Sequence, residues 1–248
     1  YAPFTLTAEG THTISYRSTD NVGNVEADRK LTVIVDNTPP VSTISVGAPQ
    51  YTTAGNLYVS GSTLITLIAT DAGSGVAKTE YSIDNSATYT TYAGPMNLAA
   101  YADGRHTITY RSPDNLGSIE PDKSVTVILD KTPPMSDITA NDPITLGGVS
   151  TVSPRTLFSL SAADNLSGVK VTEYSIDGGA WQPCMDIFSL SGLKTGQHVI
   201  SYKSIDNVLN EEAPKSITVR LVVIDVTKKI DTSLNVLIGA WRHQQERE

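Results

Sequence analysis

A segment of twelve residues occurs three times in nearly the same form: GTHTISYRSTDN from Gly10, GRHTITYRSPDN from Gly104 and GQHVISYKSIDN from Gly196. Its histidines are separated by 94 and then by 92 residues, and the Thr-Pro-Pro of residues 38–40 returns at 132–134. A period in the low nineties is the length of a β-sandwich domain and is longer than a solenoid repeat. The chain is therefore expected to fold as tandem copies of one domain.

The period divides the 248 residues into four parts. Residues 37–130 and 131–224 are two full copies, residues 1–36 match only the second half of a copy, and residues 225–248 match none. Each full copy begins beside a Pro-Pro step, which fixes φ and donates no hydrogen bond to a sheet. We expect a rod of tandem domains joined by stiff extended linkers.

Composition and alternation predict an all-β fold. Thr, Ser, Val, Ile and Tyr dominate, and 18 glycines and 13 prolines supply turns. In the repeated segment, alternation places His12, Ile14 and Tyr16 on the inward face of a penultimate strand. The pair Gly178-Gly179 predicts a two-residue hairpin turn. No stretch before residue 227 has a helical pattern, so the expected class is tandem immunoglobulin-like β-sandwiches.

Several motifs together resemble a known family. They are Y-S-I-D-G-G-x-W, then G-x-H-x-I-x-Y-x-S-x-D-N-x-x-N-x-E, then a closing strand that ends in D-x-T-P-P. This combination resembles the bacterial immunoglobulin-like repeats of the leptospiral outer-membrane OmpL type, which are common in large secreted and surface-displayed proteins. The resemblance covers about residues 1–224. It implies an extracellular β-sandwich used as a spacer, adhesin stalk or assembly module, and it carries no ligand-binding residue over to this chain.

Charge and motif content argue against several other classes. The net charge of −8 and the absence of a Lys/Arg cluster argue against a nucleic-acid surface. The single cysteine, Cys184, excludes an intramolecular disulfide, and no run of 18 apolar residues predicts a membrane-spanning helix. No catalytic motif is present, so the histidine of each copy is interpreted as a half-buried group that donates to a backbone carbonyl. We do not expect an enzyme.

The candidate ligand-binding residues are acidic turns and one aromatic ring. Asp36, Asp71, Asp130 and Asp164 fall at strand ends and linkers, and calcium takes six to eight oxygen ligands from such loops. Aspartate is also favoured in turns because it bonds its own backbone. No cofactor is therefore expected, and calcium stays an open hypothesis. Trp181 is the candidate for carbohydrate stacking, although a core or edge ring is the simpler interpretation.

The two ends of the chain do not fit a complete repeat. Residues 1–36 supply about three strands of a sandwich, whose open edges invite pairing with upstream sequence or with another chain. The tail 225–248 carries an apolar stripe that fits helical spacing and, in part, strand alternation. Such a stripe needs cover, so it is a candidate assembly surface. Its residues are Leu234, Leu237, Ile238 and Trp241.

These observations favour a non-enzymatic, secreted or surface-exposed protein that acts as a stalk or as a subunit of a filament or layer. Its expected partners are proteins, through self-association or neighbouring repeats of a longer chain. The alternative is an adhesin or a carbohydrate-binding accessory module of a larger secreted protein. An exposed patch around Trp181 would favour the alternative.

Overall fold

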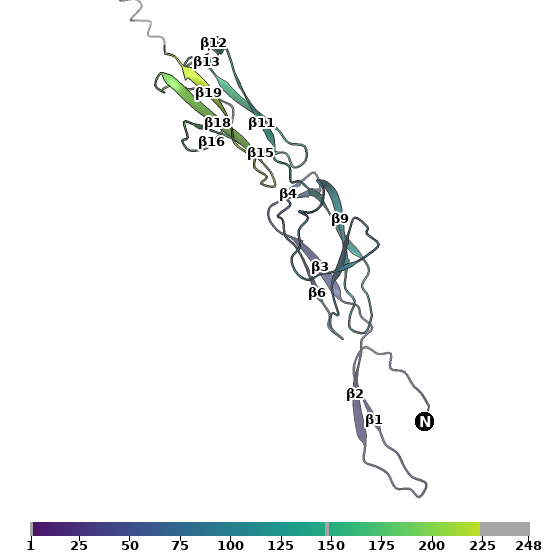
Figure 1. Ribbon diagram of the computed structural model, residues 1–248. Coiled ribbons are helices and arrows are strands. Elements are labelled where there is room, and N and C mark those ends of the chain that lie inside the picture. Colours follow the sequence, from purple (N-terminus) through teal and green to yellow (C-terminus); the bar gives the residue numbers. More distant parts are fainter. Residues whose placement is uncertain (1, 147–148, 224–248) are drawn as a thin grey trace, which may run out of the picture. The chain divides into compact units, whose positions relative to one another are not determined.

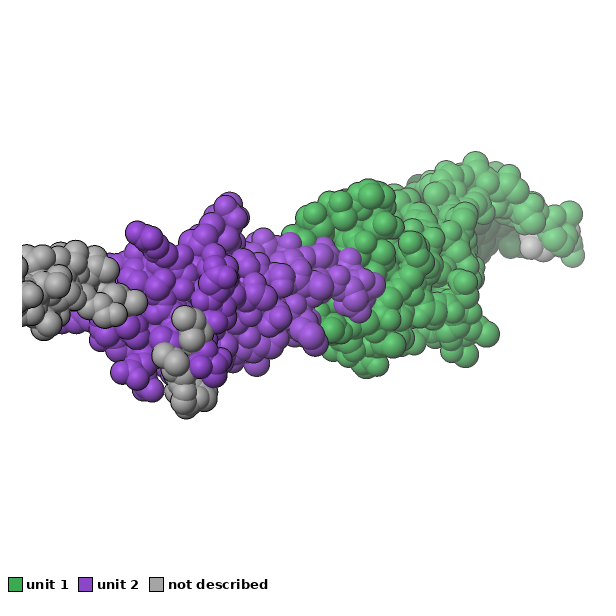
Figure 2. All heavy atoms as spheres, turned by 90° about the horizontal axis from the view of Figure 1, so that it is seen from above, with its two compact units in different colours: residues 1–132, 207–210 green, residues 133–206, 211–248 purple. Residues whose placement is uncertain are grey.

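The computed structural model describes residues 2–146 and 149–223, which form strands and turns (Figure 1). They contain no helix, so none among them is long and apolar enough to cross a membrane. The chain divides into two compact units (Figure 2). The first unit comprises residues 1–132 and 207–210, and the second unit comprises residues 133–206 and the chain from 211 onward. The expected all-β class is confirmed.

The first unit contains a free hairpin and one complete sandwich. Strand β10 pairs with β5 in parallel, and its other partner, β9, is antiparallel. The larger sheet has the order β4-β5-β10-β9-β7-β8, while β3 pairs with β6 and β1 with β2. The strands are β1 (Gly10–Tyr16), β2 (Arg29–Val35), β3 (Val41–Val46), β4 (Gln50–Thr53), β5 (Asn56–Val59), β6 (Ile65–Thr70), β7 (Glu80–Ile83), β8 (Thr90–Thr91), β9 (Gly104–Arg111) and β10 (Lys123–Leu129).

The second unit repeats this arrangement. Its larger sheet has the order β12-β13-β19-β18-β15-β16, with β13 and β19 parallel, and its smaller sheet has the order β11-β14-β17. The strands are β11 (Met135–Ala140), β12 (Ile144–Leu146), β13 (Val149–Val152), β14 (Phe158–Ala163), β15 (Val169–Ile176), β16 (Gln182–Pro183), β17 (Ile187–Phe188), β18 (Gly196–Asp206) and β19 (Lys215–Leu221).

Alternating side chains from both sheets fill one core in each unit. In β9, His106, Ile108 and Tyr110 are buried while the residues between them are half-buried, as the two-residue period of a strand requires. Burial of one such aliphatic side chain contributes about 1.5–3 kcal/mol. The first core consists of Val59, Ile65, Leu98, Ile108, Val127 and Leu129. The second consists of Val152, Phe158, Phe188, Leu190, Ile200, Val219 and Leu221.

The β1–β2 hairpin lacks the second sheet that covers its counterparts. Tyr16 is 50% exposed, whereas the equivalent Tyr110 and Tyr202 are 7% and 6% exposed. Leu31 of β2, which pairs with Ile14 and shares this face, is also exposed. Among the described residues, β1 and β2 pair only with each other. The predicted inward face of the repeated segment therefore exists in all three copies but is covered only in the two complete ones.

One turn lies one residue earlier than the sequence predicts. The hairpin after β15 turns at Asp177 and Gly178, which both have positive φ (53° and 73°), and the N–H of Gly179 donates to the carbonyl of Ile176 (2.9 Å). The prediction of Gly178-Gly179 as the turn pair is wrong. Asp177 occupies the left-handed position because its carboxylate has partners there, as described below, and aspartate tolerates that conformation.

A buried glutamate links the first strand of each sandwich to the segment that precedes its last strand. Glu120 is buried, accepts from the N–H of Ser42 (3.0 Å) and from the Ser42 hydroxyl, and pairs with Lys123 Nζ (2.8 Å). Lys123 also donates to the carbonyl of Ser42 (2.8 Å). We call this set of contacts the glutamate clamp. It satisfies a charge that would be costly to bury unpaired.

The second unit has the same clamp. Glu212 accepts from the N–H of Ser136 (3.1 Å) and from its hydroxyl, and pairs with Lys215 Nζ (2.5 Å), which donates to the Ser136 carbonyl (2.6 Å). Glu26 of the free hairpin accepts from the N–H of Ser18 instead (2.8 Å). The E-x-x-K/R spacing common to the three copies was the sequence signal for this clamp.

Substitution of the clamp glutamate is expected to destabilise its own unit. Glu120→Gln leaves Lys123 and the buried Ser42 groups without their charged partner, which should lower the free energy of unfolding by about 2–3 kcal/mol. Urea unfolding followed by circular dichroism measures the loss. Glu26→Gln, at the equivalent but more exposed position, is the matched control and should change little. An equal effect of both substitutions would contradict the role given to the clamp.

Candidate functional site

The histidine of each complete repeat is held between two acceptors. His106 donates from Nδ1 to Oδ2 of Asp84 (2.7 Å) and from Nε2 to the carbonyl of Ala102 (2.7 Å). The other carboxylate oxygen of Asp84 accepts from the N–H of Thr107 (2.9 Å). Because both ring nitrogens face acceptors, the doubly protonated imidazolium is the form that satisfies this geometry.

The second unit reproduces these contacts, and the free hairpin reproduces half of them. His198 donates to Asp177 (2.7 Å) and to the carbonyl of Lys194 (2.8 Å). His12 donates to the carbonyl of Ala8 (2.7 Å) and has no carboxylate partner in the part of the chain that the structure describes. The expected bond to a backbone carbonyl is therefore present in all three copies. The carboxylate partner was missed, although the last residue of the repeated YSID motif supplies it in both complete copies.

The electrostatics of this histidine clamp favour a charged pair. Burial alone would lower the pKa of His106, but the Ala102 carbonyl and the Asp84 carboxylate raise it above its ordinary value. The hydrogen bond to Asp177 and the Lys194 carbonyl likewise raise the pKa of His198. The imidazolium of His198 in turn lowers the pKa of Asp177. The arrangement fixes a hairpin turn against the penultimate strand. The histidine nitrogens and the aspartate oxygens make the hydrogen bonds that hold the turn there.

Trp181, the candidate for carbohydrate stacking, has a cation over one face of its ring. Lys203 Nζ lies 4.6 Å from the ring centroid and pairs with Glu211 (2.6 Å). In the first unit, Arg111 covers Tyr89 in the same way, at 3.9 Å from the centroid. Trp181 remains 36% exposed. This face of the ring therefore forms part of a cation–π contact that recurs in both units.

The four acidic candidates all lie at strand ends. Asp36 follows β2 and accepts from the N–H of Ser74 (2.5 Å), while Asp71 follows β6 and accepts from the N–H of Gly75 (2.6 Å). Asp130 follows β10, is fully buried and accepts from the N–H of Thr132 (3.1 Å). Asp164 follows β14. Asp36 and Asp71 thus meet at one turn of the first unit.

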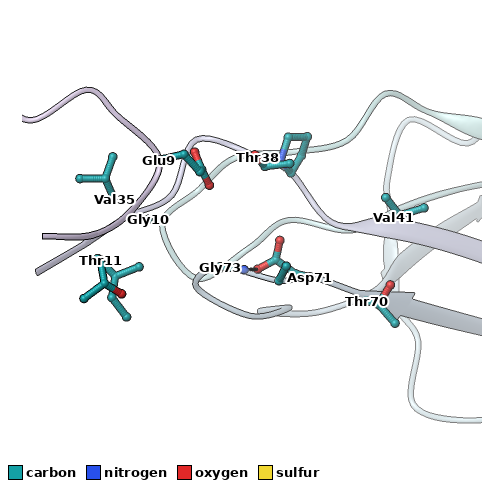
Figure 3. A pocket seen from close by; sticks show the side chains of 12 residues that line it. Glu9, Gly10, Thr11, Val35, Thr38, Val41, Thr70, Asp71 and Gly73 are labelled. Carbon is teal, nitrogen blue, oxygen red and sulfur yellow. Dashed lines mark hydrogen bonds between the residues drawn. The ribbon is translucent and has the colours of Figure 1, made fainter.

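A hollow of about 610 Å³ in the first unit opens beside this turn. Figure 3 shows Asp71, which accepts from the N–H of Gly73 (3.1 Å), among the lining residues together with Glu9 and Thr38. A side chain at Gly73 would place its Cβ 2.3 Å from the carboxyl carbon of Asp36, so any larger residue there would displace the Asp36 carboxylate. The turn is thus built to bring the Asp36 carboxylate against its backbone.

The assembly candidates lie outside the described residues. Leu234, Leu237, Ile238 and Trp241 all belong to the segment 224–248, so their predicted role and the choice between helix and strand stay predictions. Cys184 of the second unit is half-buried and contacts the carbonyl of Asp186 (3.2 Å).

Each unit packs two sheets around a single core, which defines an immunoglobulin-like β-sandwich. A comparison with solved structures finds matches of low TM-score and low sequence identity. Fibronectin type III-like modules of CbhA from Clostridium thermocellum have a TM-score of 0.41 at 14% identity, covering 72% of this chain and 94% of that chain. The D00-D0 domain of intimin has a TM-score of 0.29 at 16% identity, covering 73% of this chain and 100% of that chain.

Domains FN1–FN3 of chicken CNTN1 have a TM-score of 0.36 at 10% identity, covering 85% of this chain and 78% of that chain. A scan against protein-family models finds no match, and a search of curated proteins finds none either. Because these TM-scores and identities are low, the role of the chain has to be argued from its own residues.

The histidine clamp predicts a pH dependence of stability. Because the folded-state pKa of His106 and His198 is raised, their contribution is complete below the ordinary histidine value of about 6.5 and is lost as the pH rises through the raised pKa. The lowered pKa of Asp84 and Asp177 gives a contribution that is complete above about 3.9 and is lost as the pH falls through the lowered pKa.

Urea unfolding at pH 5.5 and pH 9 tests this prediction. Asp84→Asn should cost about 1–2 kcal/mol at pH 5.5 and less at pH 9, because the neutral histidine no longer needs the carboxylate. Asp137→Asn, which changes an exposed carboxylate, should leave the pH dependence unchanged. A parent chain whose stability is the same at both pH values, or an Asp84→Asn effect that does not shrink at pH 9, would contradict the clamp.

Proposed function

We propose that the protein is a non-enzymatic extracellular structural module, a stalk or a subunit of a surface filament or layer. The observation that carries this proposal is that both complete units use one buried glutamate and one buried histidine in the same way. The glutamate clamp and the histidine clamp each join one strand to another. The repeat motifs support membership of the OmpL type of bacterial immunoglobulin-like repeats, and an extracellular location goes with that resemblance.

The strand arrangement suits a load applied through the chain. In the first unit the last strand, β10, lies parallel to β5, and the N–H of Asp130 continues the pairing by donating to the carbonyl of Val59 (2.9 Å). In the second unit β19 lies parallel to β13, and Val222 donates to Val152 (2.9 Å). Hydrogen bonds in a parallel pair are evenly spaced and run across the strands, so a force along the strand loads them together.

The uncovered face of the β1–β2 hairpin supports attachment to a further repeat. Its exposed Tyr16 and Leu31 stand where the complete copies are covered by the strands of their first half. The segment that would cover this face is therefore the first half of another repeat, equivalent to residues 37–91. It would come from the same chain or from a neighbouring one, which would give head-to-tail assembly.

An adhesin remains the second candidate because of one surface of the second unit. Trp181 is partly exposed and Met185, four residues later, is 90% exposed. Exposed aromatic and methionine side chains are common at binding surfaces. Specific retention on a glycan or matrix-protein array that Trp181→Ala and Met185→Ser abolish would favour this candidate over the structural one.

Pulling on the chain from both ends tests the structural proposal. Each complete unit should unfold in one discrete event that extends the chain by roughly 300 Å, less the folded length, since an extended residue spans about 3.4 Å. Glu120→Gln should lower the force of one event only, because the second unit keeps its own clamp. Gradual extension without discrete events, or a substitution without effect on either force, would contradict a load-bearing role.

The mass of the 248-residue chain in solution tests the assembly proposal. Light scattering over a concentration series should show that the mass increases with concentration. The double substitution Tyr16→Ser and Leu31→Ser should suppress this increase, because it removes two large apolar side chains from the exposed face. Val199→Ser, at an exposed position of the second unit, is the control. A folded monomer at high concentration would contradict head-to-tail assembly between chains and leave a neighbouring repeat of the same chain as the covering segment.

A further inference from the structure

Two turns meet at one end of the complete sandwich in the first unit. The turn after β6 begins at Asp71 and the turn after β9 begins at Asp114, and an antiparallel bridge joins Val76 to Asp114. The side chain of Asn115 donates to the carbonyls of Ser74 (2.8 Å) and Gly75 (3.0 Å). These contacts hold the second turn, which carries Asp114, against the first, which carries Asp71.

Each carboxylate uses one oxygen to fold its own turn. Oδ2 of Asp71 accepts from the N–H groups of Gly73 (3.1 Å) and Gly75 (2.6 Å). Oδ1 of Asp114 accepts from the N–H groups of Leu116 (2.8 Å) and Ser118 (2.8 Å). Such side-chain turns are ordinary for aspartate. The second oxygen of each carboxylate is not needed for the turn.

The second oxygen of Asp114 has no partner. Asp114 is 3% exposed, and its Oδ2 is buried without a hydrogen bond to any described residue. A carboxylate oxygen without a partner is costly to bury, and a cation at this point would remove the cost.

The second unit has equivalent turns, and there the unpartnered oxygen belongs to Asp164, the counterpart of Asp71. Oδ2 of Asp164 accepts from the N–H groups of Leu166 (3.0 Å) and Gly168 (2.7 Å), while its Oδ1 is buried without a hydrogen-bond partner among the described residues. Asp206, paired with Val169 in the sheet, is fully buried. One carboxylate oxygen of Asp164 and one of Asp206 lie within 4.8 Å of each other.

This separation matches that of two oxygens bound to one calcium ion. Calcium–oxygen distances are about 2.3–2.6 Å, so two ligands of the same ion lie at most about 5 Å apart. Without an ion, two carboxylates this close repel each other in a buried place. The close approach and the unpartnered oxygen are separate observations, and both are explained by a cation.

We propose that each complete repeat binds one calcium ion between these paired turns. The ligands are Asp71 and Asp114 in the first unit and Asp164 and Asp206 in the second. The ion would then hold the two turns of each unit together.

Calcium suits these turns better than magnesium does. Calcium accepts six to eight oxygen ligands in flexible geometry, whereas magnesium requires a near-ideal octahedron and keeps several waters. The turns offer carboxylates and backbone carbonyls on loops, and the net charge of −8 favours cations in general. Extracellular calcium modules bind at about 0.1–1 mM, which sets the range for a titration.

Calorimetric titration of the full chain, stripped with a chelator, with calcium chloride tests the proposal. The expected result is binding of one ion for each complete repeat and a rise in Tm with calcium, with a smaller response to magnesium chloride. Asp114→Asn and Asp164→Asn should each abolish one binding event. Asparagine keeps the oxygen that accepts from the turn backbone, so both variants are expected to fold, which far-ultraviolet circular dichroism checks.

Two features of the variants separate a cation site from a merely structural turn. Asp114→Asn removes an unpartnered buried charge, so in chelator it should be at least as stable as the parent, and it should lose the gain in Tm that calcium gives. Asp137→Asn, which changes an exposed carboxylate, should bind calcium as the parent chain does. Absence of binding and of any Tm change up to about 10 mM calcium, or unchanged binding by both turn variants, would overturn the proposal.

Discussion

The buried glutamate that joins the first strand of each sandwich to its last is the interaction on which the rest of the structure depends. Among the described residues, strand β3 pairs only with β6 in a two-stranded sheet, and Glu120 and Lys123 both bond its Ser42 from the segment that leads into β10 of the larger sheet. With that strand in place, the apolar residues of the two sheets close over one core. Where the first strand is absent, as in the β1–β2 hairpin, Glu26 and Tyr16 stay accessible to solvent.

Periodic features of the fold were predictable from the sequence, and local polar pairings were not. The repeat spacing and the alternation in β9 predict the sandwiches because a two-residue period and a domain-length repeat admit few other folds. The hairpin β4–β5 was missed, since Gln50–Val59 shows little alternation. The turn at Asp177 was placed one residue late because sequence alone does not show that its carboxylate bonds His198.

The candidate site follows the same division. The strand-end position of Asp36, Asp71, Asp130 and Asp164 was visible in the sequence, because turn residues follow each strand. What the sequence could not show is that Asp114 keeps an unpartnered oxygen and that Asp206 approaches Asp164. Both depend on contacts between turns more than 40 residues apart, which no local pattern encodes. The clamps and the paired turns use acidic residues for opposite purposes. The carboxylates of the clamps have their partners within the chain, whereas those of the paired turns are proposed to bind a cation.

The central claim is that the glutamate clamp couples the first strand to the rest of its sandwich. A double-mutant cycle of Ser42→Ala and Glu120→Gln, measured by urea unfolding of the full chain, tests it most directly, since the cycle isolates the energy shared by the two side chains. The account predicts a coupling of about 1–3 kcal/mol in the first unit. A coupling below about 0.5 kcal/mol, the value typical of independent sites, would contradict it.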